Sequence, residues 1–246
     1  MVRLLRVYAI GMLYAKWMLK NKLFYLYLTL FMPFSILVPF YLVSPREGRP
    51  YIAVGTIVFT LLSNSLVTAC QDLAVDRLLK RVAVLLSKPI TPLEYFLGQL
   101  FSNAIQTIPA VVATIAALLL AGLLSVVDVP LLLAGLLLGW YLSTAMGYAL
   151  AMALKNADYN TVVIVSNVVS FVLVFLAPIY YPPTRLPGWA RLVATALPSL
   201  HIAGVIGAAS GVSYGIDPLV SLQYTSVLSA ALTVGVARGI SLKDLY

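Results

Sequence analysis

The sequence has little charge for its length. Only 10% of its 246 residues are charged, whereas 62% are hydrophobic, and the mean hydropathy is +1.00. A soluble domain carries about 25% charged and about 45–50% apolar residues. This chain lacks the polar surface that a soluble protein needs, and it is predicted to be an integral membrane protein.

Residues that carry out chemistry are equally scarce. The chain has one histidine, His201, and one cysteine, Cys70, and no Cys/His/Asp/Glu cluster with metal-ligand spacing. It also lacks the G-x-x-x-x-G-K-[ST] loop that cradles phosphates. The chain is therefore predicted to be no enzyme and to bind no cofactor or metal. His201 is interpreted as a hydrogen-bonding residue at the outer interface rather than as a ligand or catalytic group.

Acidic residues are missing from the middle of the apolar runs. The sequence places all eight in loops or at the ends of predicted spans: Glu47, Asp72, Asp76, Glu94, Asp128, Asp158, Asp217 and Asp244. An ion-coupled carrier usually keeps ionisable groups inside the bilayer. A secondary carrier is therefore disfavoured, and a transporter would take its energy from another polypeptide.

What the chain does have is a series of long apolar runs. A helix needs about 20 apolar residues to cross the hydrocarbon core. The predicted fold is an all-α, polytopic membrane protein with six transmembrane helices. These are residues 23–43, 51–70, 95–123, 130–154, 161–179 and 218–236. Proline predicts a kink in the first span, at Pro33 and Pro39. Thr91 and Glu94 fit a capping box at the start of the third.

Lysine and arginine lie between the runs and fix the orientation. The net charge is +8, but these residues form no soluble patch, so nucleic acid is not an expected partner. Twelve fall on the side that carries both termini, and only four fall on the other side: Arg46, Arg49, Arg185 and Arg191. The positive-inside rule then places both termini in the cytoplasm of a multi-pass protein of the cell (plasma) membrane.

Two segments are predicted to lie outside the six spans. Residues 1–22 are expected to form an amphipathic helix on the membrane surface, with Arg3, Arg6, Lys16 and Lys20 on one face. It precedes a six-span transmembrane domain, residues 23–246. Residues 180–216 are broken by proline and too short to cross, so they are expected to form an external re-entrant segment.

Two intramembrane patterns each leave two interpretations open. Small residues recur every four positions in the fourth span and allow another helix to approach, either within the chain or in a second copy. They are Gly135, Gly139, Ser143 and Gly147, continued by Ala151. Polar amides form either interhelical hydrogen bonds or the lining of a substrate pathway. The candidates are Asn103, Gln106, Asn160 and Asn167.

The order of these parts resembles the permease subunits of ABC type-2 exporters. Two segments carry the resemblance: the run LLSKPITPLEYFLGQ at residues 85–99, and APIYYP at residues 177–182 with LPGW at 186–189 and LPSLH at 197–201. Two departures stand out. Residues 77–81 read RLLKR where the family often has a Glu-rich stretch, and Leu197 stands where the family usually has Asn.

The resemblance implies partners and a contact segment. Two permeases, a second copy or a paralogue, would surround a pathway in the lipid membrane. Each would dock a separate ABC ATP-binding subunit that carries ATP and Mg. The cytoplasmic segment 71–94 would couple to it through a helix from Asp76 to Leu86. The candidate contacts are Arg77, Leu78, Leu79, Lys80, Arg81, Leu85 and Leu86. Alternatively, the basic residues bind only lipid phosphates.

The predicted function is therefore the permease subunit of an ATP-driven ABC exporter. The alternatives are an ion-coupled secondary carrier and a non-transporting membrane scaffold. The sequence does not indicate the transported substrate, nor whether the two permeases are identical.

Overall fold

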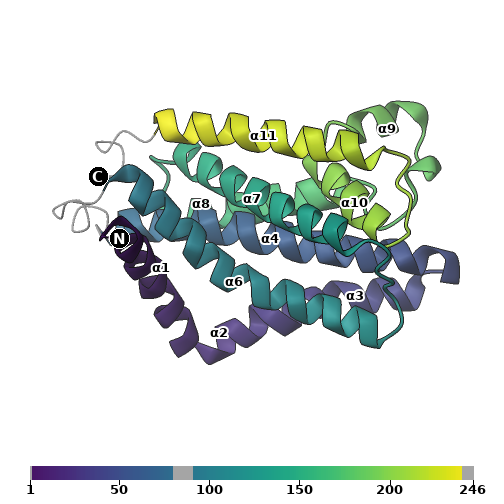
Figure 1. The fold of residues 1–246 in the computed structure, drawn as a ribbon, viewed down its shortest axis with the longest axis horizontal. Helices are drawn as coiled ribbons and strands as arrows, with labels where there is room; N and C mark the ends of the chain where they lie inside the picture. Colours follow the sequence, from purple (N-terminus) through teal and green to yellow (C-terminus); the bar gives the residue numbers. More distant parts are fainter. Residues whose placement is uncertain (1, 80–90, 240–246) are drawn as a thin grey trace.

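The computed structural model describes residues 2–79 and 91–239, and these ranges contain helices and loops but no strand. Figure 1 shows a bundle whose long helices run side by side. The elements are α1 (Val2–Lys20), α2 (Lys22–Leu26), η1 (Tyr27–Phe31), α3 (Met32–Val43), η2 (Arg46–Gly48), α4 (Arg49–Leu78), α6 (Pro92–Leu120), α7 (Val129–Ala153), α8 (Tyr159–Phe175), η3 (Pro183–Arg185), α9 (Gly188–Ala194), α10 (Pro198–Ala209) and α11 (Pro218–Gly239). The all-helical prediction is confirmed.

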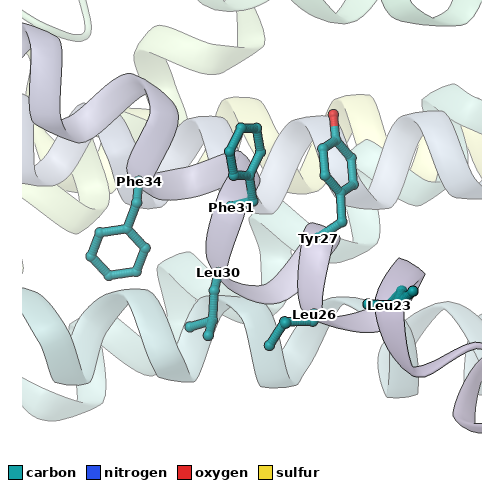
Figure 2. A pocket seen from close by; sticks show the side chains of 6 residues that line it. All are labelled: Leu23, Leu26, Tyr27, Leu30, Phe31 and Phe34. Atoms are coloured by element: carbon teal, nitrogen blue, oxygen red, sulfur yellow. The ribbon is translucent and has the colours of Figure 1, made fainter.

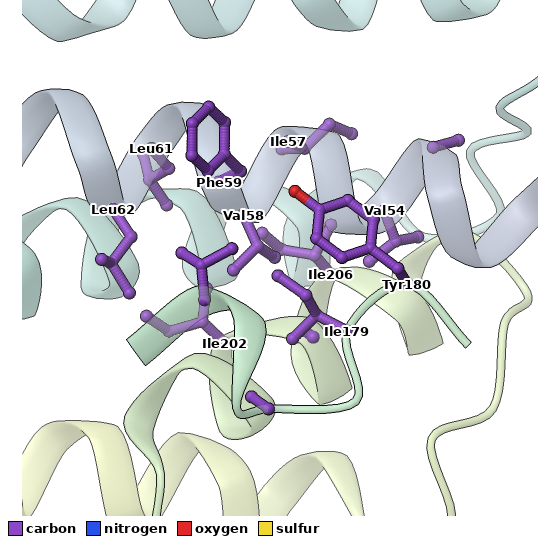
Figure 3. Close-up of a cluster of buried hydrophobic side chains, with 14 of the residues drawn as sticks. Val54, Ile57, Val58, Phe59, Leu61, Leu62, Ile179, Tyr180, Ile202 and Ile206 are labelled. Atoms are coloured by element: carbon purple, nitrogen blue, oxygen red, sulfur yellow. The ribbon is translucent and has the colours of Figure 1, made fainter. Parts of the chain in front are cut away.

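Helix α4 forms the centre of the bundle. It packs against α3, α6, α7, α8 and α10, and 94% of its most apolar stretch is buried. Every residue between 52 and 62 is buried, as expected for a helix surrounded by other helices. Figure 3 shows its side chains, including Val58 and Leu62, meeting Ile202 and Ile206 of α10 and the Tyr180 ring.

Among the described residues, four helices are long and apolar enough to cross a membrane: α4, α6, α7 and α11. Helices α9 and α10 meet at 89° and make a fifth crossing if they are taken as one broken span. The apolar helices at the predicted first and fifth spans, Thr29–Val43 and Tyr159–Phe175, are shorter. Six spans therefore remain a prediction.

The two ends of the bundle carry different connections. The start of α1, the end of α11 and the turn between α7 and α8 lie at one end, which we call the terminal end (Figure 1). The loop between α3 and α4, the loop between α6 and α7, and helix α9 lie at the opposite end. Residues that carry charge at the two ends therefore face the two sides of any membrane that the bundle spans.

Side-chain caps mark the starts of three helices, and the cap at Thr91 was predicted. The Thr91 hydroxyl accepts a hydrogen bond from the Glu94 amide at 3.2 Å, and the Glu94 carboxylate accepts one from the Thr91 amide at 2.8 Å. This confirms the capping box of α6. Asp128 and Asp158 accept bonds from backbone amides in the first turns of α7 and α8.

The irregular turn of the first span lies just before its first proline. Residues Tyr27–Phe31 form a π-helical turn, and Met32 N–H bonds to the Tyr27 carbonyl, five residues back. Proline displaces the carbonyl four residues before it. For Pro33 that residue is Thr29, inside this turn, so the wider π geometry accommodates the ring. Pro39 lies inside α3.

Candidate functional site: a buried polar seam

Helices α4 and α6 face each other with two rows of polar side chains. Apart from the adjacent Gln106 and Thr107, successive positions in each row are three or four residues apart, so they share one face of their helix. We call this set the polar seam. It consists of Ser65, Thr68, Asp72 and Asp76 on α4 and Tyr95, Gln99, Asn103, Gln106 and Thr107 on α6.

Asp76 forms the part of the seam nearest the terminal end. Its Oδ2 accepts hydrogen bonds from the Tyr95 hydroxyl at 2.6 Å and from Gln99 Nε2 at 2.8 Å. Asp76 and Gln99 are both 0% exposed. Hydrogen bonds to a carboxylate are short and stronger than those between neutral groups. A buried acid therefore joins α4 to α6.

This position corrects one sequence prediction. The second span was expected to end at Cys70, ahead of a separate coupling helix from Asp76 to Leu86. Instead, α4 continues two turns past Cys70 to Leu78. Asp72 and Asp76 belong to these last turns, so they lie at the end of a span, as expected, but not in a loop. The charged sequence of residues 71–78 suggested a loop, but the polar partners on α6 allow these residues to stay helical and packed.

Asn103 is the most connected residue in the middle of the seam. Its Nδ2 donates to the Ser65 carbonyl at 3.0 Å and to Thr68 Oγ1 at 2.7 Å. Its Oδ1 accepts from Trp140 Nε1 at 2.8 Å and from Thr144 Oγ1 at 3.0 Å. One amide thus holds α4, α6 and α7 together.

The other predicted pathway amides are placed differently. Gln106 is buried and donates to Asp72 Oδ2 at 2.9 Å, so it makes an interhelical hydrogen bond like Asn103. Asn160 is exposed on α8, and half-buried Asn167 donates to the Val163 carbonyl of its own helix at 2.7 Å. The structure does not bring these two amides to the seam.

The small residues of α7 face other helices of the same chain. A Cβ on Gly139 would lie 2.8 Å from Leu61 of α4 and 2.9 Å from Ile202 of α10. Gly135 meets Val205 of α10, and Gly147 meets the backbone of α4. Ser143 is buried and donates to the Gly139 carbonyl at 2.7 Å. Of the two interpretations, the structure favours packing within the chain. The small residues are covered by α4 and α10, so a second copy cannot contact them.

The start of the predicted coupling segment lies at the end of α4. Arg77 was expected to project outward, but it is half-buried and donates to the Ala151 carbonyl in the last turn of α7. Leu78 and Leu79 are 64% and 52% exposed. The remaining candidate contacts lie outside the described residues: Lys80, Arg81, Leu85 and Leu86.

Helix α1 packs directly on α6. The position of Gly98 is so close to α1 that a Cβ there would lie 2.7 Å from Ile10 Cβ, and Gly11 lies against the Phe101 ring. Glycines at a crossing allow two helix backbones to approach. Arg6 Nη1 lies 3.7 Å from Glu94 Oε1, which adds an ion pair to this contact. The membrane-surface location of residues 1–22 stays a prediction.

A stripe of large apolar side chains on the first span was missed by the sequence analysis. Its members are spaced three and four residues apart and line an open groove on the surface of the bundle (Figure 2). We call it the apolar stripe: Leu23, Leu26, Tyr27, Leu30, Phe31 and Phe34. All but Phe34 are exposed, and the Tyr27 and Phe31 rings stack at 5.5 Å. The spacing was visible in the sequence and is that of a helix packing seam.

His201 lies inside the bundle rather than at an interface with water. It is buried on α10, and its ring stacks on Tyr224 of α11 with centroids 3.9 Å apart. Nε2 lies 2.8 Å from the Thr195 carbonyl and Nδ1 3.3 Å from Ser221 Oγ. The expected hydrogen bonding is present. Within residues 2–79 and 91–239, no group of His, Cys, Asp and Glu could hold a metal ion.

The helices and their buried polar contacts define a polytopic helical membrane protein. Its family follows from comparison with known families, because the model of the ABC-2 type transporter family matches residues 4–206. The match covers most of the chain, from α1 into α10. The protein therefore belongs to the ABC-2 type transporter family and is a membrane transport permease. No curated protein matches the sequence.

Proposed function

We propose that this chain is the permease subunit of an ATP-driven exporter of the plasma membrane, powered by a separate ATP-binding subunit. The observation that carries the proposal is the family match across residues 4–206, since members of this family are transporters. This chain lacks a phosphate-binding loop, so ATP hydrolysis would take place on another subunit. ATP and Mg would then bind to the partner subunit. The chain's own residues would bind that subunit and carry its movement into the bundle.

The end of α4 supports a docking surface for the ATP-binding subunit. Leu78 and Leu79 present two large apolar side chains at the terminal end of the bundle, next to the half-buried Arg77. Under the positive-inside rule this end faces the cytoplasm. Lipid does not shield exposed leucine side chains from water there. Adjacent exposed apolar side chains in water are typical of a protein contact.

The first span supports pairing with a second permease. Residues 22–43 form one continuous helical path through α2, η1 and α3, about 33 Å long at 1.5 Å per residue. That length is enough to cross the hydrocarbon core. The apolar stripe runs along this path, and its spacing fits another helix. A second copy or a paralogue packed there would place a pathway between the two chains, with six spans in each.

The docking surface can be tested with a co-expressed ABC ATP-binding subunit. We expect the double variant Leu78→Asp, Leu79→Asp to insert normally but to lose copurification of that subunit in mild detergent. The matched control is Leu42→Asp, Val43→Asp, which changes two exposed apolar residues at the opposite end. The control should keep the subunit. Equal recovery with both variants would remove the docking role of α4.

An ion-coupled carrier is the second candidate, because the structure places Asp76 in a buried position between helices. Buried acids of this kind bind coupling ions in carriers. A carrier would be recovered without any ATP-binding subunit, and its export would stop when a protonophore is added at constant ATP. An ATP-driven permease would keep exporting under the same treatment.

A further inference from the structure

The ends of α4 and α6 that flank residues 80–90 are joined by buried hydrogen bonds. The chain leaves α4 after Leu78 and enters α6 at Pro92. Asp76, two residues before the end of α4, is bonded to Tyr95 and Gln99 in the first two turns of α6. The two helix ends that flank residues 80–90 are therefore tied together.

The residues next to these extend the connection to two further helices. Glu94, which precedes Tyr95, caps α6 and also pairs with Arg6 of α1. Arg77, which follows Asp76, donates to the Ala151 carbonyl of α7. Two pairs of neighbouring residues, Asp76 with Arg77 and Glu94 with Tyr95, thus connect the four helices α1, α4, α6 and α7.

The chemistry at this junction resists separation more than apolar packing does. A carboxylate is costly to bury and is stable there only while its hydrogen-bond donors stay in place. Moving α4 away from α6 would leave the Asp76 carboxylate without the Tyr95 and Gln99 donors. Sliding of two apolar faces would carry no such penalty.

We propose that Asp76 is a positioning residue that makes the terminal ends of α1, α4, α6 and α7 move as one body during transport. A push from the ATP-binding subunit on Leu78 and Leu79 would then reach all four helices through Tyr95, Glu94 and Arg77. This inference rests on the proposed function. Asp76 itself touches neither substrate nor nucleotide in this scheme.

The test follows relative movement of α4 and α6 in the complex with the ATP-binding subunit. Spin labels are placed at Val75, half-buried on α4 and outside the docking surface, and at Leu97, exposed on α6. With Asp76 present, the distance between the labels should be the same without nucleotide and with ATP-vanadate. In Asp76→Asn, which keeps the size but loses the charge, the distance distribution should broaden or shift with ATP-vanadate.

A matched control separates coupling from general packing. Ser170→Ala removes another buried interhelical bond of α4, the 2.7 Å contact between the Ser63 and Ser170 hydroxyls. It should leave the label distance unchanged in both states. Both variants should still copurify with the ATP-binding subunit. Binding of the permease changes the rate of ATP hydrolysis by that subunit, and this change should be about tenfold smaller in Asp76→Asn only.

Each outcome decides one of the two proposals. An unchanged label distance and hydrolysis in Asp76→Asn would overturn the positioning role and leave the proposed function intact. Failure of the unmodified chain to bind any ATP-binding subunit would overturn the proposed function instead. If Asp76→Asn does not assemble, Tyr95→Phe removes a single bond of the junction. Misassembly of that variant too would make the junction a folding element and end the proposal.

Discussion

Gly147 of α7 lies directly against the backbone of α4 at Leu66. A Cβ at position 147 would contact the Leu66 carbonyl oxygen and would stand 2.8 Å from Ala69 Cβ. Neither atom can rotate away, because one belongs to the backbone and the other is itself a Cβ. The position therefore accepts glycine alone.

We expect Gly147→Ala to destabilise the protein by about 1–3 kcal/mol, since overpacking forces the two helices apart. The control is Gly235→Ala in α11, where an added Cβ meets nothing within 4 Å. Replacing an exposed helical glycine by alanine adds stability of up to about 1 kcal/mol. Thermal unfolding in detergent should separate the two variants, and equal midpoints would contradict the close contact.

The crossing of α1 over α6 gives a second prediction. Gly98→Leu should detach α1, because a side chain at position 98 meets Ile10 at 2.6 Å. Protease cleavage within residues 2–20 should become faster while the rest of the bundle stays intact. Gly188→Leu, at a position with open space around it, is the control. Unchanged cleavage in Gly98→Leu would mean that α1 does not rest on α6.

The amides of the transmembrane region should differ sharply in importance. Asn103→Ala leaves partners on two other helices, α4 and α7, unsatisfied, at a cost of about 1–3 kcal/mol for each buried group. Asn167→Ala removes only a bond within α8 and should change stability by about 0.5 kcal/mol or less. Denaturation in mixed micelles compares the two. A larger loss for Asn167 would show that a partner outside this chain binds it.

The start of α8 should respond to acid. The hydrogen bond from the Thr161 hydroxyl, and then that from its amide, lower the pKa of Asp158 below its usual value. A carboxyl whose pKa is lower in the folded state stabilises that state above its unfolded pKa, about 3.9. The stabilisation is lost as the pH falls through the folded pKa.

Amide exchange at Thr161 should therefore rise with acidification below about pH 4, relative to the intrinsic rate. Asp158→Asn keeps a capping oxygen but has no charge to titrate. Its protection should not depend on pH in this range. The same acid response in both proteins would assign the effect to another group.

The charge distribution predicts the topology of the chain. A reporter at Lys155, in the turn between α7 and α8, should read cytoplasmic, and so should one at Lys88. Reporters at Glu47 and Arg185, at the opposite end of the bundle, should read external. A cytoplasmic reading at Arg185 would be incompatible with six spans.

Local signals in the sequence were sufficient for most helix boundaries. Thr91 and Glu94 mark the start of α6, and Pro130 and Pro218 lie in the first turns of α7 and α11, as the apolar runs suggested. Each signal acts within one turn of the residue that carries it. Boundaries of this kind need no knowledge of the rest of the fold.

The end of α4 and the role of Arg77 could not be predicted in the same way. The charged residues after Cys70 favour a loop when they are considered alone. What keeps them helical is a set of partners about twenty to seventy positions away: Tyr95, Gln99, Gln106 and the Ala151 carbonyl. A single sequence shows which residues are polar but not which of them meet.

The π-helical turn at Tyr27–Phe31 has a consequence for sequence comparison. Each hydrogen bond in such a turn spans one residue more than in an α-helix, so the turn stores one extra residue. Deleting one residue there would restore the regular helix, and the helical segments on either side would keep their contact faces, because the wide turn absorbs the extra residue locally. A homologue with a one-residue gap at this position is therefore expected to keep the packing of α1 on α6 and of α3 on α4.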